Sequence, residues 1–159
     1  QNLIDKIKAK NIDIENINLS VGAGTFQPVK SENIEDHDIH EEYVEVSSQV
    51  VDKVNKTRLN GGRVIAVGTT AARALESAFI DTNKREFKEF TNLFIYPGYK
   101  FRAIDMLVTN FHLPKSSLLM LVSAFIGFDQ MKVIYQTAVA EKYRFLSYGD
   151  AMLLKKNEI

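Results

Sequence analysis

The sequence predicts an α/β fold in which helices flank a mixed sheet. Short apolar runs rich in β-branched residues alternate along the chain with longer segments whose apolar residues recur at helical spacing. The clearest case is the segment 60–78, where a helix end, a compact strand, a turn and a second helix follow one another. With 159 residues, of which 45% are hydrophobic, the chain fits one globular domain. Such alternation within one domain is typical of α/β proteins.

The predicted elements of the first half begin with a helix and end with a strand-turn-helix unit. They are a helix over 3–10, a strand over 17–21, a glycine-rich turn over 22–28, a strand over 42–46, a helix ending at 59, a strand over 63–67 and a helix ending at 78. Ser47 or Ser48 is the expected N-cap of the second helix, because a hydroxyl accepts hydrogen bonds from the first turn. Thr69 or Thr70 is the expected N-cap of the third helix for the same reason.

The second half is predicted to contain the remaining strands and two apolar helices. The expected elements are an exposed charged loop over 81–89, a strand over 93–96, a turn at 97–98, a strand over 106–108, helices over 116–126 and 129–142, a polar turn over 147–150 and an apolar stretch to 154. Gly127 lies between the two helices, where glycine readily ends a helix.

Composition argues against several classes of protein. The 20 basic residues balance the 20 acidic ones, which argues against a generic polyanion binder. There is no cysteine, so a disulfide framework and a thiolate metal site are excluded. No apolar run reaches the roughly 20 residues of a membrane-spanning helix, and the first residues show no signal-peptide pattern. We therefore expect a cytoplasmic protein with no membrane partner.

The segment 109–116 places polar side chains between two buried elements, a pattern typical of a functional site. An apolar strand precedes it, and a nearly continuous apolar helix follows it. His112 is flanked by Asn110 and Lys115, and Pro114 stiffens the turn. Two interpretations of His112 stay open, an acid–base residue and a structural histidine satisfied by hydrogen bonds.

The strand-to-helix turn 67–70 has the ingredients of an anion site. Free backbone N–H groups and the positive end of a helix would face a phosphate or a carboxylate beside Thr69 and Thr70. Arg73 follows within the same helix. The alternative is a threonine-capped helix in which Arg73 and Glu76 form an ordinary i,i+3 pair. The turn carries no complete nucleotide-binding fingerprint.

The segment 22–42 contains further candidates of two kinds. They are Gly22, Gly24, Thr25, His37, His40 and Glu42. The glycines with the threonine would let backbone N–H groups approach a ligand closely, or would only form a turn. The histidines and the glutamate are candidates for acid–base or hydrogen-bonding roles, with a surface loop as the alternative. Their spacing matches no zinc signature, so we expect no metal.

The segment 143–150 mixes aromatic, cationic and carboxylate side chains. Arg144, Tyr148 and Asp150 are its polar members. Surfaces that stack bases and bind phosphates combine such groups. The alternative is an aromatic core rim with an Arg144–Asp150 ion pair.

Five motifs occur along the chain in the order seen in one known family. They are VGAGTFQPV at 21–29, GRVIAVGTT at 62–70, FIYPG at 94–98, TNFHLPK at 109–115 and YRFLSYGDAM at 143–152. The histidine segment, from His37 to Tyr43, also fits that family's pattern. On these residues, which cover essentially the whole chain, the sequence resembles the S-adenosylmethionine:tRNA ribosyltransferase-isomerases of queuosine biosynthesis. It departs from their pattern with Ser20 for histidine, Ile39 for methionine and Ser117 for threonine.

The resemblance implies an unusual use of S-adenosylmethionine as a ribosyl donor. The ribosyl group is transferred and isomerised onto 7-aminomethyl-7-deazaguanine in the tRNA anticodon, which gives epoxyqueuosine-tRNA and releases adenine and methionine. Such chemistry needs a proton acceptor, stabilisation of developing charge and close placement of both substrates. The predicted acid–base residues are His112, His37, His40 and Glu42. The predicted substrate-binding residues are Gly22, Gly24, Thr25, Thr69, Thr70, Arg73, Asn110, Lys115, Arg144, Tyr148 and Asp150.

Members of this family are longer than the present chain by an N-terminal part of the α/β domain and an inserted β-barrel. The resemblance therefore implies that residues 1–159 form the C-terminal portion of the α/β catalytic domain. The expected partners are the deazaguanine-containing tRNA, S-adenosylmethionine and a complementary N-terminal chain. The alternative function is an inactive fragment or a tRNA-binding module that retains the fold without turnover.

Overall fold

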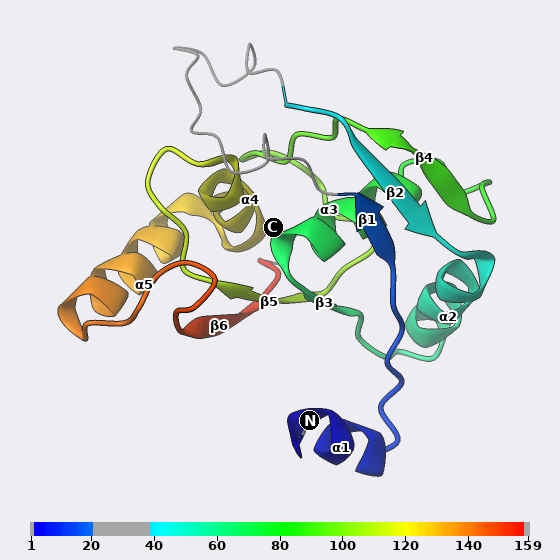
Figure 1. Ribbon diagram of the computed structural model, residues 1–159, viewed down its shortest axis with the longest axis horizontal. Coiled ribbons are helices and arrows are strands. Elements are labelled where there is room, and N and C mark those ends of the chain that lie inside the picture. Colours follow the sequence, from blue (N-terminus) through cyan, green and yellow to red (C-terminus); the bar gives the residue numbers. More distant parts are fainter. Residues whose placement is uncertain (1, 21–38, 158–159) are drawn as a thin grey trace.

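The computed structural model describes residues 2–20 and 39–157, and in this part of the chain two three-stranded sheets lie on either side of a central helix (Figure 1). The helices are α1 (Asn2–Ala9), α2 (Ser48–Leu59), α3 (Thr69–Ala78), α4 (Ser117–Ile126) and α5 (Phe128–Ala140). The strands are β1 (Asn18–Ser20), β2 (Glu42–Val46), β3 (Ile65–Val67), β4 (Phe87–Thr91), β5 (Met106–Asn110) and β6 (Ala151–Lys155).

The mixed sheet has the order β3-β5-β6 and confirms the predicted α/β class. β3 runs parallel to β5, with Ala66 opposite Leu107, and β6 runs antiparallel to β5, with Leu154 opposite Leu107. These side chains are buried on the face that packs against α3 and α4. The parallel pair matters for the site, because the carboxyl ends of β3 and β5 meet at the same edge of the sheet.

The second sheet is antiparallel and has the order β1-β2-β4. β2 is its central strand, and Glu42, Val44 and Val46 are all buried. Because β2 and β3 both contact α3, that helix is covered from two sides, and every residue from Ala72 to Ala78 is buried. Any charged side chain on this part of α3 therefore needs a partner in the core.

Two parts of the second half differ from the prediction. β4 begins inside the segment predicted as an exposed loop. It is an edge strand whose three central residues face solvent, so its sequence resembles that of a loop. Only its two end residues, Phe87 and Thr91, are buried. The predicted strand at 93–96 pairs with no other strand, although Ile95 is buried within it. The apolar stretch after the last turn forms β6.

The predicted cap is correct for α2 and wrong for α3, and α4 has a side-chain cap that was not predicted. The Ser47 hydroxyl accepts from the Val50 N–H of α2 at 3.4 Å. The Ser116 hydroxyl accepts from the Leu119 N–H of α4 at 3.1 Å. α3 instead begins after Gly68, and no side chain caps it. The reason is that the chain turns into α3 through Gly68 at φ 98°, so that Thr69 already belongs to the helix.

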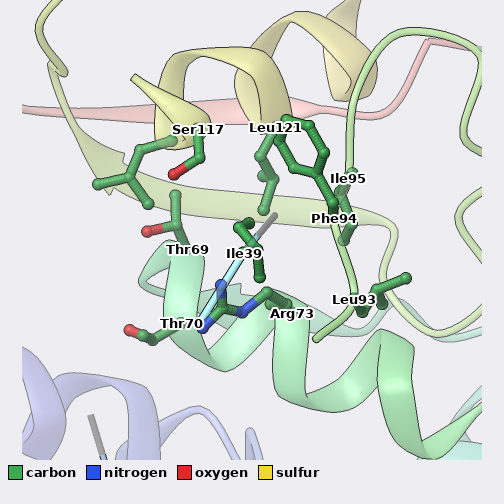
Figure 2. A pocket seen from close by; sticks show the side chains of 10 residues that line it. Ile39, Thr69, Thr70, Arg73, Leu93, Phe94, Ile95, Ser117 and Leu121 are labelled. Carbon is green, nitrogen blue, oxygen red and sulfur yellow. The ribbon is translucent and has the colours of Figure 1, made fainter. Parts of the chain in front are cut away.

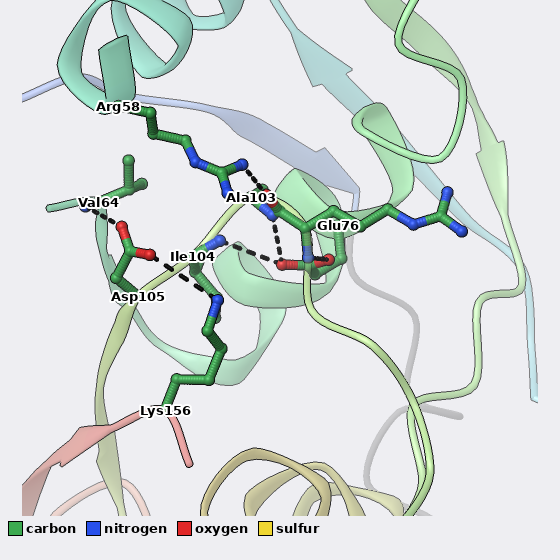
Figure 3. Close-up of polar contacts among 8 residues, drawn as sticks. Arg58, Val64, Glu76, Ala103, Ile104, Asp105 and Lys156 are labelled. Atoms are coloured by element: carbon green, nitrogen blue, oxygen red, sulfur yellow. Dashed lines mark hydrogen bonds and ion pairs between the residues drawn. The ribbon is translucent and has the colours of Figure 1, made fainter. Parts of the chain in front are cut away.

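Glu76 on α3 holds the segment that leads into β5 (Figure 3). Its fully buried carboxylate accepts hydrogen bonds from the backbone N–H groups of Arg102, Ala103 and Ile104 at 2.8, 2.9 and 3.2 Å. It also accepts one from the Tyr99 hydroxyl at 3.2 Å. Buried N–H groups need such acceptors, so Glu76 fixes where β5 starts.

α4 and α5 form a bent pair around Gly127, which has φ 87°. Their axes differ by 116°, and only together do they have the length and apolar composition of a membrane span; no single helix of the described residues has both. α4 carries Leu121, Val122 and Phe125, which are buried in the core. Its packing is therefore that of a core helix.

Candidate functional site

The carboxyl edge of the parallel pair β3–β5 gathers most of the described residues predicted from the polar turns. α3 starts directly after β3, and the turn 111–116 leads from β5 into α4. The Gly68 N–H donates to the Val108 carbonyl at 2.8 Å and ties the two strand ends together. In α/β sheets, ligands bind outside the carboxyl ends of parallel strands, where helix N-termini point toward them. This edge is therefore the expected place for a ligand.

A small pocket lies at this edge between the first turns of α3 and α4 (Figure 2). Its lining comes from α3, α4 and the irregular segment before β5. The residues are Thr69, Thr70, Arg73, Ser117, Leu118, Leu121, Leu93, Phe94 and Ile95, with Ile39. Its cavity volume of about 10 Å³ holds about one water molecule. Three of the predicted substrate-binding residues thus share one pocket.

No side chain of the described residues caps the N-terminus of α3. The first backbone hydrogen bond of the helix runs from the Ala72 N–H to the Gly68 carbonyl at 3.1 Å, and no side chain caps the earlier N–H groups. These N–H groups and the helix dipole favour an anion. α4 differs, because Ser116 already satisfies one of its N–H groups. The predicted anion site at Thr69 and Thr70 therefore has the backbone geometry that it requires.

Two side chains with hydroxyl groups, Thr69 and Ser117, line the pocket. Thr69 and Ser117 are each 8% exposed. Figure 2 shows both hydroxyl oxygens on the side chains that line the gap between α3 and α4. Hydroxyl groups on a pocket wall can donate hydrogen bonds to a ligand and accept them from it.

Arg73 lies in the same pocket and forms a buried ion pair with Glu42 of β2. The guanidinium is 6% exposed and the carboxylate 1% exposed. Burial lowers the pKa of Arg73 below its usual value. The alternative pairing of Arg73 with Glu76 is wrong, because Glu76 is bonded to the segment before β5. Glu42 therefore holds the Arg73 side chain at the pocket wall.

His112 is buried in the turn that follows β5 and has two hydrogen-bond partners. Its ring nitrogen Nε2 is 3.0 Å from the Thr109 hydroxyl, and its backbone N–H donates to the Tyr135 hydroxyl at 3.0 Å. Burial lowers the pKa of the His112 imidazole to about 4. At neutral pH the ring is therefore uncharged and is able to accept a proton or a hydrogen bond. This geometry fits both interpretations of His112 that the sequence left open.

The loop 143–150 is tied to the end of β5. The Asn110 side-chain amide donates to the Asp150 carbonyl at 3.2 Å. Arg144 and Asp150 form an exposed ion pair at 2.9 Å, which raises the pKa of Arg144 and lowers that of Asp150. Tyr148 is 98% exposed, and Lys115 is exposed at φ 59°. The aromatic ring and the cations are thus accessible on the surface next to the site.

The remaining predicted residues are placed in part. His40 is exposed. Gly22, Gly24, Thr25 and His37 lie outside the described residues, so their roles stay predictions. Within the described ranges, no group of three acidic or histidine side chains is arranged to hold a metal ion. The absence of a metal likewise stays a prediction.

Sequence reasoning did not identify Ser117, the apolar segment 93–95 or Glu76 as parts of this region. Ser117 follows Ser116, and the usual reading of such a pair assigns one serine as the cap and leaves the other without a role. The FIYPG motif overlaps the segment 93–95 and was the available signal for it. A β-rich run before a Pro-Gly turn predicts a strand, however, and so gives no sign of a pocket wall. The position of Glu76 depends on a contact with residues far along the chain.

Two comparisons with known proteins agree with the motifs. A family model described as "Queuosine biosynthesis protein" matches residues 1–154. The crystal structure of an S-adenosylmethionine tRNA ribosyltransferase from Thermotoga maritima is similar, with a TM-score of 0.80 and 41% sequence identity. The match covers 96% of this chain and 48% of that one, so this chain spans about half the length of that relative. The chain therefore belongs to the queuosine biosynthesis protein family.

Proposed function

We propose that this chain forms a substrate-binding and catalytic portion of an S-adenosylmethionine-dependent tRNA ribosyltransferase-isomerase. Family membership and the 41% identity with a ribosyltransferase support this function. The observation that carries it is the pocket at the carboxyl edge of β3 and β5, where the N-terminus of α3, which no described side chain caps, lies beside the hydroxyl groups of Thr69 and Ser117 and the side chain of Arg73. That arrangement is suited to an anionic part of a substrate.

The proposed reaction transfers and isomerises the ribosyl group of S-adenosylmethionine onto the aminomethyl group of 7-aminomethyl-7-deazaguanine in tRNA. Epoxyqueuosine-tRNA is the product, and adenine and methionine leave. S-adenosylmethionine is thus a substrate, and no metal is required. We place this reaction in the cytoplasm.

The chain's residues divide into three roles in this proposal. Thr69, Thr70 and Arg73 anchor an anionic group, because they line the pocket at the end of α3. Glu42 acts through Arg73, whose side chain it positions. The acid–base candidates are the neutral ring of His112 with His37 and His40. A neutral imidazole with a low pKa is a weak base, so it needs close contact with the proton that it removes.

The surface next to the pocket is assigned to tRNA. Tyr148 offers an exposed ring on which a base can stack, and Arg144 with Lys115 offers cations for phosphates. Asn110 and Asp150 hold the loop that carries Tyr148 against the end of β5. Base recognition and donor binding would then occur at neighbouring places on one sheet edge.

Turnover by this chain is expected to need the other half of a family-length protein. The chain spans 48% of the similar ribosyltransferase, and we propose that it corresponds to the C-terminal portion of the α/β catalytic domain. A complementary N-terminal chain, or the same portion on a longer polypeptide, would complete the pocket. The present cavity of about 10 Å³ is too small for S-adenosylmethionine.

Adenine release tests the proposed function directly. The chain is incubated with S-adenosylmethionine and the deazaguanine-containing tRNA, with and without the N-terminal half of a family protein, and free adenine is measured by chromatography. We expect adenine only in the complete mixture, in amounts equal to the modified tRNA. A tRNA with guanine at the same position is the control and should give none. No adenine in the complete mixture would refute the enzyme.

The second candidate function is a tRNA-binding module without turnover, favoured by the fully exposed ring of Tyr148 beside Arg144. It predicts tRNA binding by the chain alone and no adenine under any condition. Binding measured by fluorescence anisotropy, set beside the adenine assay, distinguishes the two candidates.

A further inference from the structure

The mixed sheet β3-β5-β6 has one face covered by helices and an opposite face that the described residues leave uncovered. Figure 1 shows α3 and α4 on the same side of this sheet, and both contact it. Val67 is 71% exposed, Leu153 61% and Ile65 46%. In the strand register these side chains belong to two rows that cross the other face, and we call their six members the uncovered face: Ile65, Met106 and Lys155 in one row, and Val67, Val108 and Leu153 in the next.

The antiparallel sheet shows how a face that meets solvent is built in this protein. Its outer face combines polar side chains, Asn18, Glu45 and Lys88, with one pair of aromatic rings. The Asn18 amide donates to the Glu45 carboxylate at 3.3 Å. Apart from Lys155, at the end of a row, every member of the uncovered face is apolar. The two sheets therefore differ in what their outer faces are suited to meet.

The strands of the mixed sheet have the composition of strands that are buried on both faces. Successive side chains of a strand point to opposite faces, so a strand with one wet face alternates apolar and polar residues. β3 reads IAV, β5 begins with MLV and β6 contains AMLL, without such alternation. Parallel strands occur almost only in sheets whose two faces are both covered, usually by helices. Because β3 and β5 are a parallel pair, we expect a cover on the uncovered face.

The comparison with the Thermotoga maritima ribosyltransferase indicates what this cover is. The match includes 96% of this chain and 48% of that one, so more than half of the relative has no counterpart here. A polypeptide of that length can supply a layer of helices. A second copy of this chain would instead bring another sheet face, and helices are the usual cover of parallel strands.

We propose that the uncovered face is the interface for the part of a family-length protein that this chain lacks, and that this part covers it with the apolar side of a helix. The identity of the occupant rests on the proposed function, in which this chain is one portion of a longer enzyme. The apolar character of the interface rests on the sheet. The interface is separate from the pocket, whose lining comes from α3, α4 and the segment before β5.

Co-expression tests the interface. The chain is produced together with the segment of the Thermotoga maritima ribosyltransferase that has no counterpart here, and the mass of the purified material is measured by light scattering. We expect a complex with one copy of each polypeptide. Leu153→Glu should weaken this complex at least about a hundredfold in a titration of the labelled segment, because a carboxylate would be buried among apolar groups. No complex with the original chain would overturn the proposal.

Matched variants locate the interface. Val67→Glu should also weaken the complex, whereas Val139→Glu on α5 is its control, because Val139 is 67% exposed but lies on another element. Leu59→Glu, at the end of α2, is the control for Leu153→Glu. Circular dichroism checks that each variant folds, and Val67→Glu decides if Leu153→Glu does not fold. Unchanged affinity in the folded variants of the uncovered face, or an equal loss in the controls, would contradict the assignment.

Two further outcomes separate this interface from its alternatives. A dimer of this chain that Leu153→Glu disrupts, and that does not bind the segment, would assign the face to a second copy and overturn the proposal. A complex that depends on Leu153 but releases no adenine with both substrates would keep the interface and refute the enzyme. Adenine release that Leu153→Glu leaves unchanged would keep the enzyme and refute the interface.

Discussion

The central helix α3 carries one buried carboxylate, Glu76, and pairs with another, Glu42 of β2, and the two are satisfied in different ways. Glu76 accepts from three consecutive backbone N–H groups and the Tyr99 hydroxyl (Figure 3). Glu42, from the other sheet, instead pairs with the Arg73 side chain, one turn earlier on α3. Both carboxylates are at most 1% exposed. Burial alone therefore does not distinguish a structural carboxylate from one at a functional site.

The partners make the distinction. Backbone N–H groups cannot be replaced or withdrawn, so Glu76 serves to fix the segment before β5. The partner of Glu42 is the side chain of Arg73, which also lines the pocket. A buried ion pair is a weak source of stability compared with apolar packing. Its retention at the pocket wall is consistent with a role for Arg73 in binding.

The largest expected effect is that of Glu76→Ala. It leaves three backbone N–H groups without an acceptor in the core, and each is unfavourable by roughly 1–3 kcal/mol. We expect the free energy of unfolding to fall by at least about 4 kcal/mol, measured by urea denaturation. A loss below about 1 kcal/mol would show that water or another group replaces the carboxylate.

The second largest effect is expected for Glu42→Gln. The free energy of unfolding should fall by about 3 kcal/mol, because Arg73 becomes a buried charge without a counterion. The double variant Glu42→Leu with Arg73→Met should recover most of this stability. It should nevertheless abolish adenine release in the complete mixture. A double variant that stays active would remove the difference between Glu42 and Glu76, since both would then be structural.

His112 is a third buried titratable group and predicts a pH dependence. Its pKa is about 4 in the folded state, compared with about 6.5 when unfolded, so the unfolded state binds more protons between these values. Stability should fall as pH decreases from about 6.5 to about 4, by up to about 3 kcal/mol. His112→Asn should flatten this part of the profile. If the free energy of unfolding depends on pH in the same way in the original protein and in His112→Asn, the low pKa of His112 is contradicted.

The smallest effect on stability is expected for Arg144→Ala, because its ion pair with Asp150 is exposed. We expect no measurable change in urea denaturation. The affinity for tRNA should fall, and the salt dependence of binding should decrease by about one unit of slope, since one phosphate contact is lost. Lys132→Ala, an exposed cation on α5, is the control and should leave both unchanged. Equal effects of the two variants would indicate nonspecific attraction.

Much of the site was predictable because its signals are local. The polar turns after two strands predicted Thr69, Thr70, Asn110 and His112 as site residues, and the structure brings these residues to one edge of the mixed sheet. What could not be predicted is which groups across the chain satisfy each buried side chain. Arg73 has Glu76 three residues away on the same helix, yet it pairs with Glu42 of another strand. The edge strand β4 was missed for a related reason, since only its pairing with β2 defines it.

The sequence by itself determined the α/β class, the order of most elements, the cap at Ser47 and the family. These depend on periodicity and on side-chain chemistry within a few residues. Only the tertiary structure decided that the strands divide into two sheets around α3, and that Thr69 and Ser117 face one another across a pocket. The physical reason is that burial forces each polar group to find a partner in space, wherever the fold brings one near.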